Sequence, residues 1–459
     1  MRKSLFLCAL SIICCSSLKN EPVTIITLSP LEADSALLVQ QMEKEAQSLT
    51  LSQAIIAATT EHPTIKAAKL THEIAQLAEK SAWAGFLPTI GLTSSAVASK
   101  ATPTGQFATT LSASQNLINL AGPKTRAKQA GIDTKIAQTQ ISAAQQEKRA
   151  AVEALFLNTW LKQEEYAVLK KELAFSQENQ KINQEKYEAG LLSLPEYQKT
   201  IADACATEMK CTIHNNQLIS LLAELEEMTG IFLTDGSDAK MHLEWNPNLT
   251  FQLDSVDTYI SLALKNRLEL EIHKLNYKRT RIDERFALGK TFPSLSAVGQ
   301  YSYDYQPGNP DYRSYSSYTK TNFFGGLQLS WNLFDGTLSK IEAETARIKA
   351  LKSTTDKEIT QKKIEKEIKQ LYNSLKVSHQ QAAVSLAQLR ASTSTLQSSQ
   401  DACTVGSMTT TTLLGSATHQ LKAQFEHLTH LVQFQRQFFA LNAGCGYALD
   451  LSGNTFGEK

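Results

Sequence analysis

The chain has 459 residues, with 46 basic and 45 acidic side chains and a net charge of +1. This length allows about three average domains. The balanced charge argues against a nucleic-acid-binding surface and against an acidic tail, and the modest glycine and proline contents exclude a collagen-like or low-complexity chain.

Residues 1–19 have the pattern of a secretory signal peptide. Arg2 and Lys3 precede the apolar run SLFLCALSIICC, which is followed by a polar segment. The run is too short for a stable membrane-spanning helix, and no later stretch reaches about 18 consecutive apolar residues. Cys15 is a candidate lipidation site, but SIICC is a poor lipobox, so simple cleavage is favoured. Residues 20–48 form an N-terminal extension, to which no function is assigned.

Residues 49–254 are predicted to form a first repeat. A helix over 49–85 ends before Pro88, because proline lacks the N–H that a helix interior needs. A β-hairpin follows over 88–118, with strands at 89–99 and 107–117 joined by KATPTGQ. Residues 124–187 contain one glycine and no proline, which predicts a very long helix. Gly190 marks a turn into a returning helix.

Residues 255–448 are predicted to repeat this plan, and residues 449–459 form a C-terminal tail. Pro293 follows Pro88 at an offset of 205, and Gly406 follows Gly190 at an offset of 216. The repeat predicts a helix over 255–288, a β-hairpin over 293–334, a long helix over 337–405 and a returning helix. At 1.5 Å per residue, the two long helices would each reach roughly 95–105 Å.

Apolar residues of the long helices recur at coiled-coil spacing. Ile364, Ile368, Leu371 and Leu375 are separated by four, three and four residues. The same kind of spacing occurs in the returning helix at Leu421, Phe425, Leu428 and Val432. These patterns predict long antiparallel helical hairpins packed as coiled coils.

The four predicted strands have the length and alternation of membrane strands. Leu327, Leu329, Trp331 and Leu333 alternate with polar residues, and about ten tilted residues cross a bilayer. Trp331 and the nearby tyrosines suit the membrane interface. Four strands cannot close a barrel, and open edges in lipid leave backbone groups unpaired, so closure would require several chains; three would supply twelve strands. Ordinary half-buried hairpins of a soluble secreted protein are the simpler alternative for the strands alone.

The whole pattern resembles the outer-membrane efflux protein family, the TolC-like exit ducts of Gram-negative bacteria. The resemblance rests on LTLSQAIIAATTEHPTIKAAK, on the strand entries GFLPTIGL and FPSLSAVG at Pro88 and Pro293, on LSWNLFDG and on the two glycine turns. It implies a mainly α-helical chain with four strands, and a homotrimer with a twelve-stranded outer-membrane barrel and a periplasmic α-helical barrel. It also implies docking to a periplasmic adaptor and an inner-membrane transporter.

The resemblance also implies a periplasmic gate near the glycine turns. The family places acidic residues six and nine positions after the second turn glycine and often a basic residue two positions after it; here these are Thr412, Gly415 and Met408. In the first repeat the sixth position is Glu196, which matches. We therefore expect a neutral constriction over Met408–Gly415 that binds cations less strongly than an acidic ring would. The alternative is that these threonines only cap and pack the helix turn.

No nucleotide-binding loop, HExxH motif or nucleophile–base arrangement is found, so neither a cofactor nor an enzymatic activity is expected. His427 and His430 lie three residues apart on a helix, but they lack partners at metal-ligand spacing, which favours a packed or solvated pair. The prediction is a passive exit duct of a tripartite efflux or type I secretion system, moving small molecules or proteins. The alternative is a secreted helical structural or adhesin-like protein without a pore.

Overall fold

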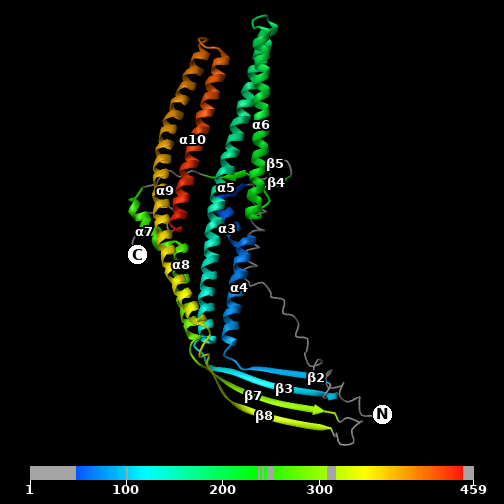
Figure 1. Ribbon diagram of the computed structural model, residues 1–459. Helices are drawn as coiled ribbons and strands as arrows, with labels where there is room; N and C mark the ends of the chain where they lie inside the picture. The colour runs from blue at the N-terminus through cyan, green and yellow to red at the C-terminus, as the bar shows by residue number, and fades with distance from the viewer. Residues whose placement is uncertain are drawn as a thin grey trace, which may run out of the picture. The chain divides into compact units, whose positions relative to one another are not determined.

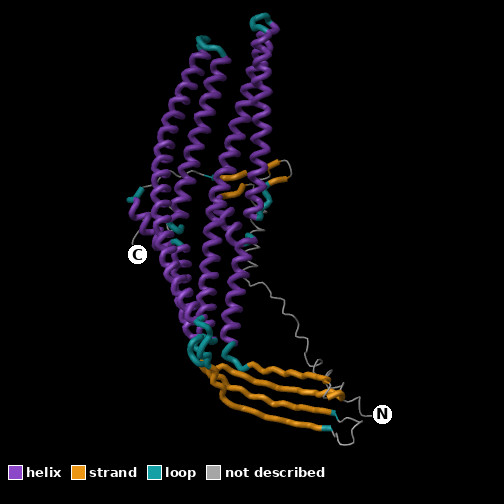
Figure 2. Tube along the Cα trace, viewed as in Figure 1, coloured by secondary structure: helices purple, strands orange, loops and turns teal. Residues whose placement is uncertain are grey.

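The computed structural model describes residues 48–99, 102–235, 238–239, 242–245, 253–307 and 317–447. The predicted signal peptide, most of the N-terminal extension, Cys15 and the C-terminal tail lie outside these residues. These described residues make up one compact unit. Figure 2 shows that long helices dominate this unit and that the strands gather mainly at one end of them.

Two long helical hairpins organise the unit (Figure 1). The first pairs α5 (Pro123–Glu188) with α6 (Leu194–Thr229), and the second pairs α9 (Leu338–Thr404) with α10 (Thr410–Gly444). Ile364, Ile368 and Leu375 of the predicted seam are fully buried between the helices, as the coiled-coil spacing requires. The predicted long helical hairpins are therefore confirmed.

Shorter helices extend the arrangement beside the long ones. They are α3 (Leu51–Thr60), α4 (Pro63–Ala84), α7 (Val256–Asn266) and α8 (Leu268–Gly289). Helix α4 packs on α5, α5 on α8, and α8 on α9, so these four form a layer with α4 at one edge and α9 at the other. No described helix combines the length and the apolar character that a transmembrane helix needs.

The predicted continuous helices over 49–85 and 255–288 are wrong, because each is broken in two. The first breaks at His62, since Pro63 can only start a new helix; the His62 Nδ1 accepts a hydrogen bond from the Thr64 N–H at 3.1 Å. The second breaks at Arg267, whose backbone is extended. Its guanidinium donates to the Gly444 carbonyl at 2.7 Å and pairs with Glu367 at 2.6 Å.

The main sheet contains four antiparallel strands in the order β2–β3–β7–β8. They are β2 (Thr89–Ser99), β3 (Thr102–Ile118), β7 (Ser294–Gln306) and β8 (Tyr318–Ser330). Short strands β1 (Ser48–Thr50) and β6 (His242–Glu244) pair in parallel, and β4 (Thr234–Asp235) pairs with β5 (Asp238–Ala239). The sequence patterns did not reveal these short strands.

Two predicted strand boundaries require correction. Strand β3 begins at Thr102 rather than Phe107, because a register shift between Val97 and Ser99 and a left-handed Gly105 (φ +83°) let Thr102 pair with Ser99 beyond the pair of Val97 and Gln106. Strand β8 ends at Ser330, so Trp331 and Leu333 lie beyond it. The Trp331 indole N–H instead donates to the Thr291 carbonyl at 3.1 Å.

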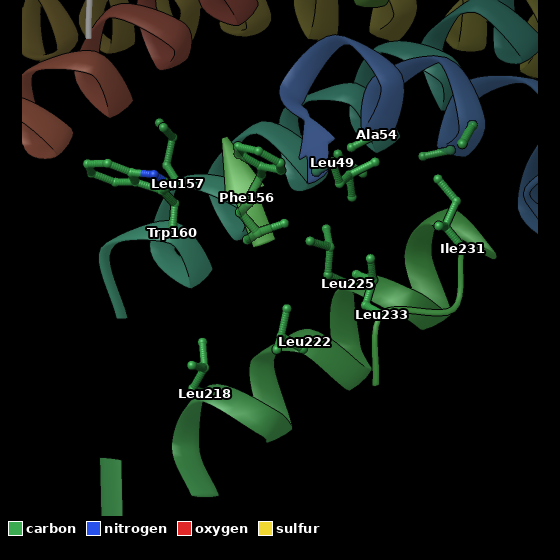
Figure 3. Packing of buried hydrophobic residues seen from close by; sticks show 14 of the residues in the cluster. Leu49, Ala54, Phe156, Leu157, Trp160, Leu218, Leu222, Leu225, Ile231 and Leu233 are labelled. Carbon is green, nitrogen blue, oxygen red and sulfur yellow. The ribbon is translucent and has the colours of Figure 1, made fainter. Parts of the chain in front are cut away.

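The largest apolar cluster lies where the first hairpin meets α3 (Figure 3). Phe156 and Leu157 of α5 meet Leu222 and Leu225 of α6, and all four are at most 1% exposed. A second cluster joins α7 and α8 to the second hairpin around Tyr259, Ile364 and Phe434. These two clusters stabilise the middle of the unit. The hairpin tips and the main sheet lie outside them.

Gly289 shows how closely α8 approaches the connection between β3 and α5. A Cβ added there would lie 2.7 Å from the Ala121 nitrogen and 2.9 Å from the Leu120 oxygen. We expect Gly289→Ala to destabilise the detergent-solubilised protein by about 1–3 kcal/mol, because backbone atoms must move apart.

Gly415 supplies the matched control, because a Cβ at this helical position meets open space. Gly415→Ala should be neutral or stabilising by about 0.5–1 kcal/mol. Thermal unfolding followed by circular dichroism measures both variants, and equal midpoints would contradict the expected close approach at Gly289.

Candidate functional site

The main sheet has one mostly apolar and one mostly polar face. At one level of the register, Leu92, Leu111, Tyr301 and Phe323 lie side by side across the four strands. At the adjacent level, Thr93, Thr110, Ser302 and Asn322 occupy the opposite face, because successive strand residues point to opposite sides.

The large apolar side chains are exposed in the single chain. Phe323 is 82% exposed and Ile90 is 73% exposed. The polar face carries serine, threonine, asparagine and glutamine, with Asp304 directly opposite Lys320. A sheet of this kind can separate an apolar surrounding medium from water.

The sheet is open at both edges, because β2 and β8 each pair on one side only. The helical layer is also open at both edges. On α4, Leu70, Ile74 and Leu77 are 50–66% exposed, and on α9, Ile341 and Ile348 are 59% and 57% exposed. The sequence-based predictions did not include these two edge stripes, although their spacing of three, four and seven residues was a usable signal.

The two hairpin tips have the same local geometry. Gly190 and Gly406 adopt left-handed backbone conformations, with φ values of +71° and +77°. In the first tip, Leu191 N–H donates to the Lys186 carbonyl at 2.8 Å, and in the second, Ser407 N–H donates to the Ala402 carbonyl at 2.9 Å. These are the bonds of a glycine-terminated helix, which explains why the chain reverses at these points.

The candidate gate residues begin the returning helices. Glu196 forms a capping box with Ser193, whose hydroxyl donates to the carboxylate at 2.7 Å, and this hydrogen bond lowers the pKa of Glu196. In the second hairpin, Thr409 is the N-cap and its hydroxyl lies 2.9 Å from that of Thr412. Glu196 and Thr412 therefore occupy equivalent helix positions, one charged and one neutral.

The other predicted residues lie apart from one another. Met408 is partly buried in the second tip just before α10, whereas Gly415 lies within α10 and is exposed. Pro88 and Pro293 immediately precede β2 and β7, and Trp331 immediately follows β8, so all three stand where strands meet helices. The expected capping contacts are present, because the Thr412 N–H donates to the Thr409 hydroxyl at 3.4 Å.

The described residues contain no group of three or more histidine, cysteine, aspartate or glutamate side chains placed to hold a metal ion. His427 is buried in the seam of the second hairpin, where its Nδ1 lies 2.9 Å from the Ser385 hydroxyl. Burial lowers the pKa of His427, and His430 lowers it further. His427 is thus packed into the hairpin, whereas His430 is only half-buried.

A buried carboxylate, absent from the sequence-based predictions, fastens α10 to α5. Glu153 is 1% exposed and accepts a hydrogen bond from Arg149 at 2.8 Å and another from the Tyr447 hydroxyl at 3.4 Å. Burial raises the pKa of Glu153. The Arg149 guanidinium also lies 4.3 Å from the centre of the Tyr447 ring. This cluster ties the end of the second hairpin to the first.

An exposed two-faced antiparallel sheet joined to long helical hairpins defines a membrane channel of the exit-duct type. The model of the outer membrane efflux protein family matches residues 54–231 and 259–446. The chain therefore belongs to the outer membrane efflux protein family and is an outer membrane efflux channel. The sequence-based recognition of the family is confirmed, and the alternative of a secreted protein without a pore is set aside.

Solved structures show the same fold at low sequence identity. The Campylobacter jejuni CmeC outer membrane channel is 16% identical, with a TM-score of 0.71 over 88% of this chain and 86% of that one. CusC is 14% identical, with a TM-score of 0.69 over 86% and 92%. Vibrio cholerae VceC is 16% identical, with a TM-score of 0.65 over 86% and 96%. No curated protein gives a significant sequence match.

Proposed function

We propose that three copies of the chain close one twelve-stranded barrel and form a passive exit duct. The observation that carries this proposal is the pair of unsatisfied edges on each copy. Strand β8 of one copy would pair with β2 of the next, and the apolar stripe of α9 would cover that of α4. The two edges of one copy are different surfaces, and each would contact the other edge on a neighbouring copy. The contact between copies is therefore head-to-tail, and three such contacts would close a ring.

The apolar face of the sheet would then contact lipid and the polar face would line the lumen. Closure removes the unpaired backbone groups that would otherwise cost several kcal/mol each in lipid. The helical layers of the three copies would continue the wall into the periplasm. In this arrangement, residues 49–254 and residues 255–448 are two repeats of one unit. Each repeat supplies one β-hairpin to the barrel.

The hairpin tips are proposed as the periplasmic entrance. They lie at the opposite end of the helices from the main sheet (Figure 1). Leu191 and Val405 at the two tips are 79% and 83% exposed, so each tip presents an apolar side chain that a docked protein could cover. We propose that the tips dock to a periplasmic adaptor, which connects the duct to an inner-membrane transporter, and that the second tip forms a neutral gate around Met408, Thr412 and Gly415.

A charged substitution at one edge of the helical layer tests the proposed trimer. Ile348→Glu places a carboxylate in the α9 stripe and should cost about 1.5–3 kcal/mol per interface in lost apolar contact alone. Ile56→Glu on α3 is the matched control, because Ile56 is 55% exposed and belongs to neither stripe. Light scattering of the detergent-solubilised protein should show trimers for the wild type and the control, and more monomer for Ile348→Glu.

Conductance in planar bilayers tests the duct itself. The wild-type protein should produce single-channel currents in potassium chloride. A monomeric wild-type protein that produces no current would refute the proposed duct.

A further inference from the structure

Three of the four helix ends nearest the sheet are far more basic than the rest of the chain, whereas the end of α4 carries Glu79 and Lys80. Together, three segments contain 13 lysines and arginines but only five aspartates and glutamates: residues 123–137, 278–290 and 338–352. The whole chain contains 46 basic and 45 acidic side chains. These segments belong to α5, α8 and α9, at the end where the helices meet the strands (Figure 1). The excess charge is therefore concentrated at one level of the molecule.

Each of the five acidic side chains is already paired with a cation. Asp133 and Asp283 both contact Arg279, at 2.6 and 3.6 Å. The remaining three pairs are Glu284 with Arg281, Glu342 with Lys290, and Glu344 with Arg347, at 2.6, 2.6 and 3.6 Å. The local acids thus cannot neutralise the other cations.

Five cations next to the sheet are left without a carboxylate within 4.0 Å among the residues that the structure describes. We call them the basic collar: Lys124, Arg126 and Lys128 of α5, Arg285 of α8 and Lys340 of α9, all of them exposed. Each lies within about 9 Å of the sheet-proximal end of its helix along the helix axis, which is about one Debye length at physiological ionic strength.

Exposed aromatic side chains lie in the connections at the same level. Phe292, Trp331 and Phe334 are 56%, 58% and 81% exposed, and Trp83 stacks on Phe86 with ring centres 5.4 Å apart. Exposed tryptophan and phenylalanine beside membrane strands are typical of the boundary between lipid tails and headgroups. With the sheet in the membrane as proposed, the basic collar would stand at the height where lipid phosphates lie.

We propose that the basic collar binds anionic phospholipid headgroups in the leaflet from which the helices emerge. A lysine or arginine close to an anionic membrane surface attracts it, and guanidinium groups can bind phosphate through two hydrogen bonds. In the trimer the collar would present fifteen such cations around the duct. The inference rests on the proposed placement of the sheet in the membrane.

The test compares lipids added to the full-length protein in a neutral detergent. The wild-type thermal midpoint should rise with added phosphatidylglycerol and respond much less to phosphatidylcholine, and the response should weaken as salt is raised. In the triple variant Lys124→Gln, Lys128→Gln, Lys340→Gln, the phosphatidylglycerol concentration for the half-maximal rise should increase on the order of tenfold or more.

The matched control removes three exposed lysines of α9 away from the sheet: Lys362→Gln, Lys363→Gln, Lys366→Gln. It has the same net charge and should keep the wild-type response. Equal responses of the two triple variants, or equal effects of the two lipids, would overturn the proposal. A midpoint rise reproduced by inorganic phosphate would overturn it in favour of a free-anion site.

Single-channel current measured on the same preparations separates this proposal from the proposed function. A conducting trimer that does not respond to phosphatidylglycerol overturns the collar alone. A wild-type protein that neither trimerises nor conducts overturns the duct and, with it, the collar.

Discussion

Replacing Arg149 by methionine is expected to destabilise the protein by about 3–5 kcal/mol at neutral pH, because the buried Glu153 carboxylate loses its cationic partner. Arg149 donates to Glu153 at 2.8 Å, and the Glu153 side chain is 2% exposed. A buried charge without a partner is among the costliest defects a fold can hold. Thermal or urea unfolding of the detergent-solubilised protein measures the loss.

The pH dependence of this variant has a definite sign. The folded protein already raises the pKa of Glu153 above the reference value of 4.5 by burial, and losing Arg149 should raise the pKa further. A carboxyl with a raised folded pKa binds its proton more tightly in the folded state, so its contribution to stability is greatest below the unfolded pKa and decreases as pH rises through the folded pKa. The Arg149→Met variant should therefore regain stability as the pH is lowered toward the unfolded pKa.

The double variant Arg149→Met, Glu153→Gln is the control for this mechanism. It removes the buried charge together with its partner, so it should recover much of the stability at neutral pH. If the double variant is as unstable as Arg149→Met, then the lost contact of the Arg149 guanidinium with the Tyr447 ring, rather than the unpaired charge, accounts for the effect.

Introducing glutamate at Thr412 is expected to convert a weakly selective duct into a cation-selective one. Three copies would add three carboxylates around the proposed gate, and rings of carboxylates attract cations and repel anions. The fold should tolerate the change, because Thr409 is the N-cap and a glutamate three residues later completes a capping box. Glu196 already makes this arrangement with Ser193 in the first hairpin.

The measurement is the reversal potential in a potassium chloride gradient across a planar bilayer. The wild type should reverse near zero, and Thr412→Glu should shift toward the potassium equilibrium potential. Thr212→Glu, on an exposed position of α6 away from the tip, adds the same charge and should leave the reversal potential near zero. An unchanged reversal potential in Thr412→Glu would remove Thr412 from the conduction path.

Much of the fold was predictable because the hydrophobic pattern of each single segment agrees with the strand or long helix that this segment forms. The alternation at Leu327 and Leu329 marked β8, and the seam at Ile364 and Ile368 marked the second hairpin. Left-handed glycines at both tips placed the turns, because few other residues adopt that conformation cheaply. For the candidate gate, sequence position identified both Glu196 and Thr412, and the structure added that each is the third residue after its N-cap, Ser193 or Thr409.

The amino-acid sequence by itself determined the kind and order of the main elements, since helix length and strand alternation depend on neighbouring residues. Only the tertiary structure decided where contacts between distant segments override that local signal. No proline or glycine in the sequence signals the helix break at Arg267. At this break Arg267 contacts Glu367 and Gly444, which lie 100 and 177 residues away in the chain. The burial of Glu153 and the open edges at β2, β8, α4 and α9 likewise depend on which elements become neighbours, which a periodic pattern in one segment does not specify.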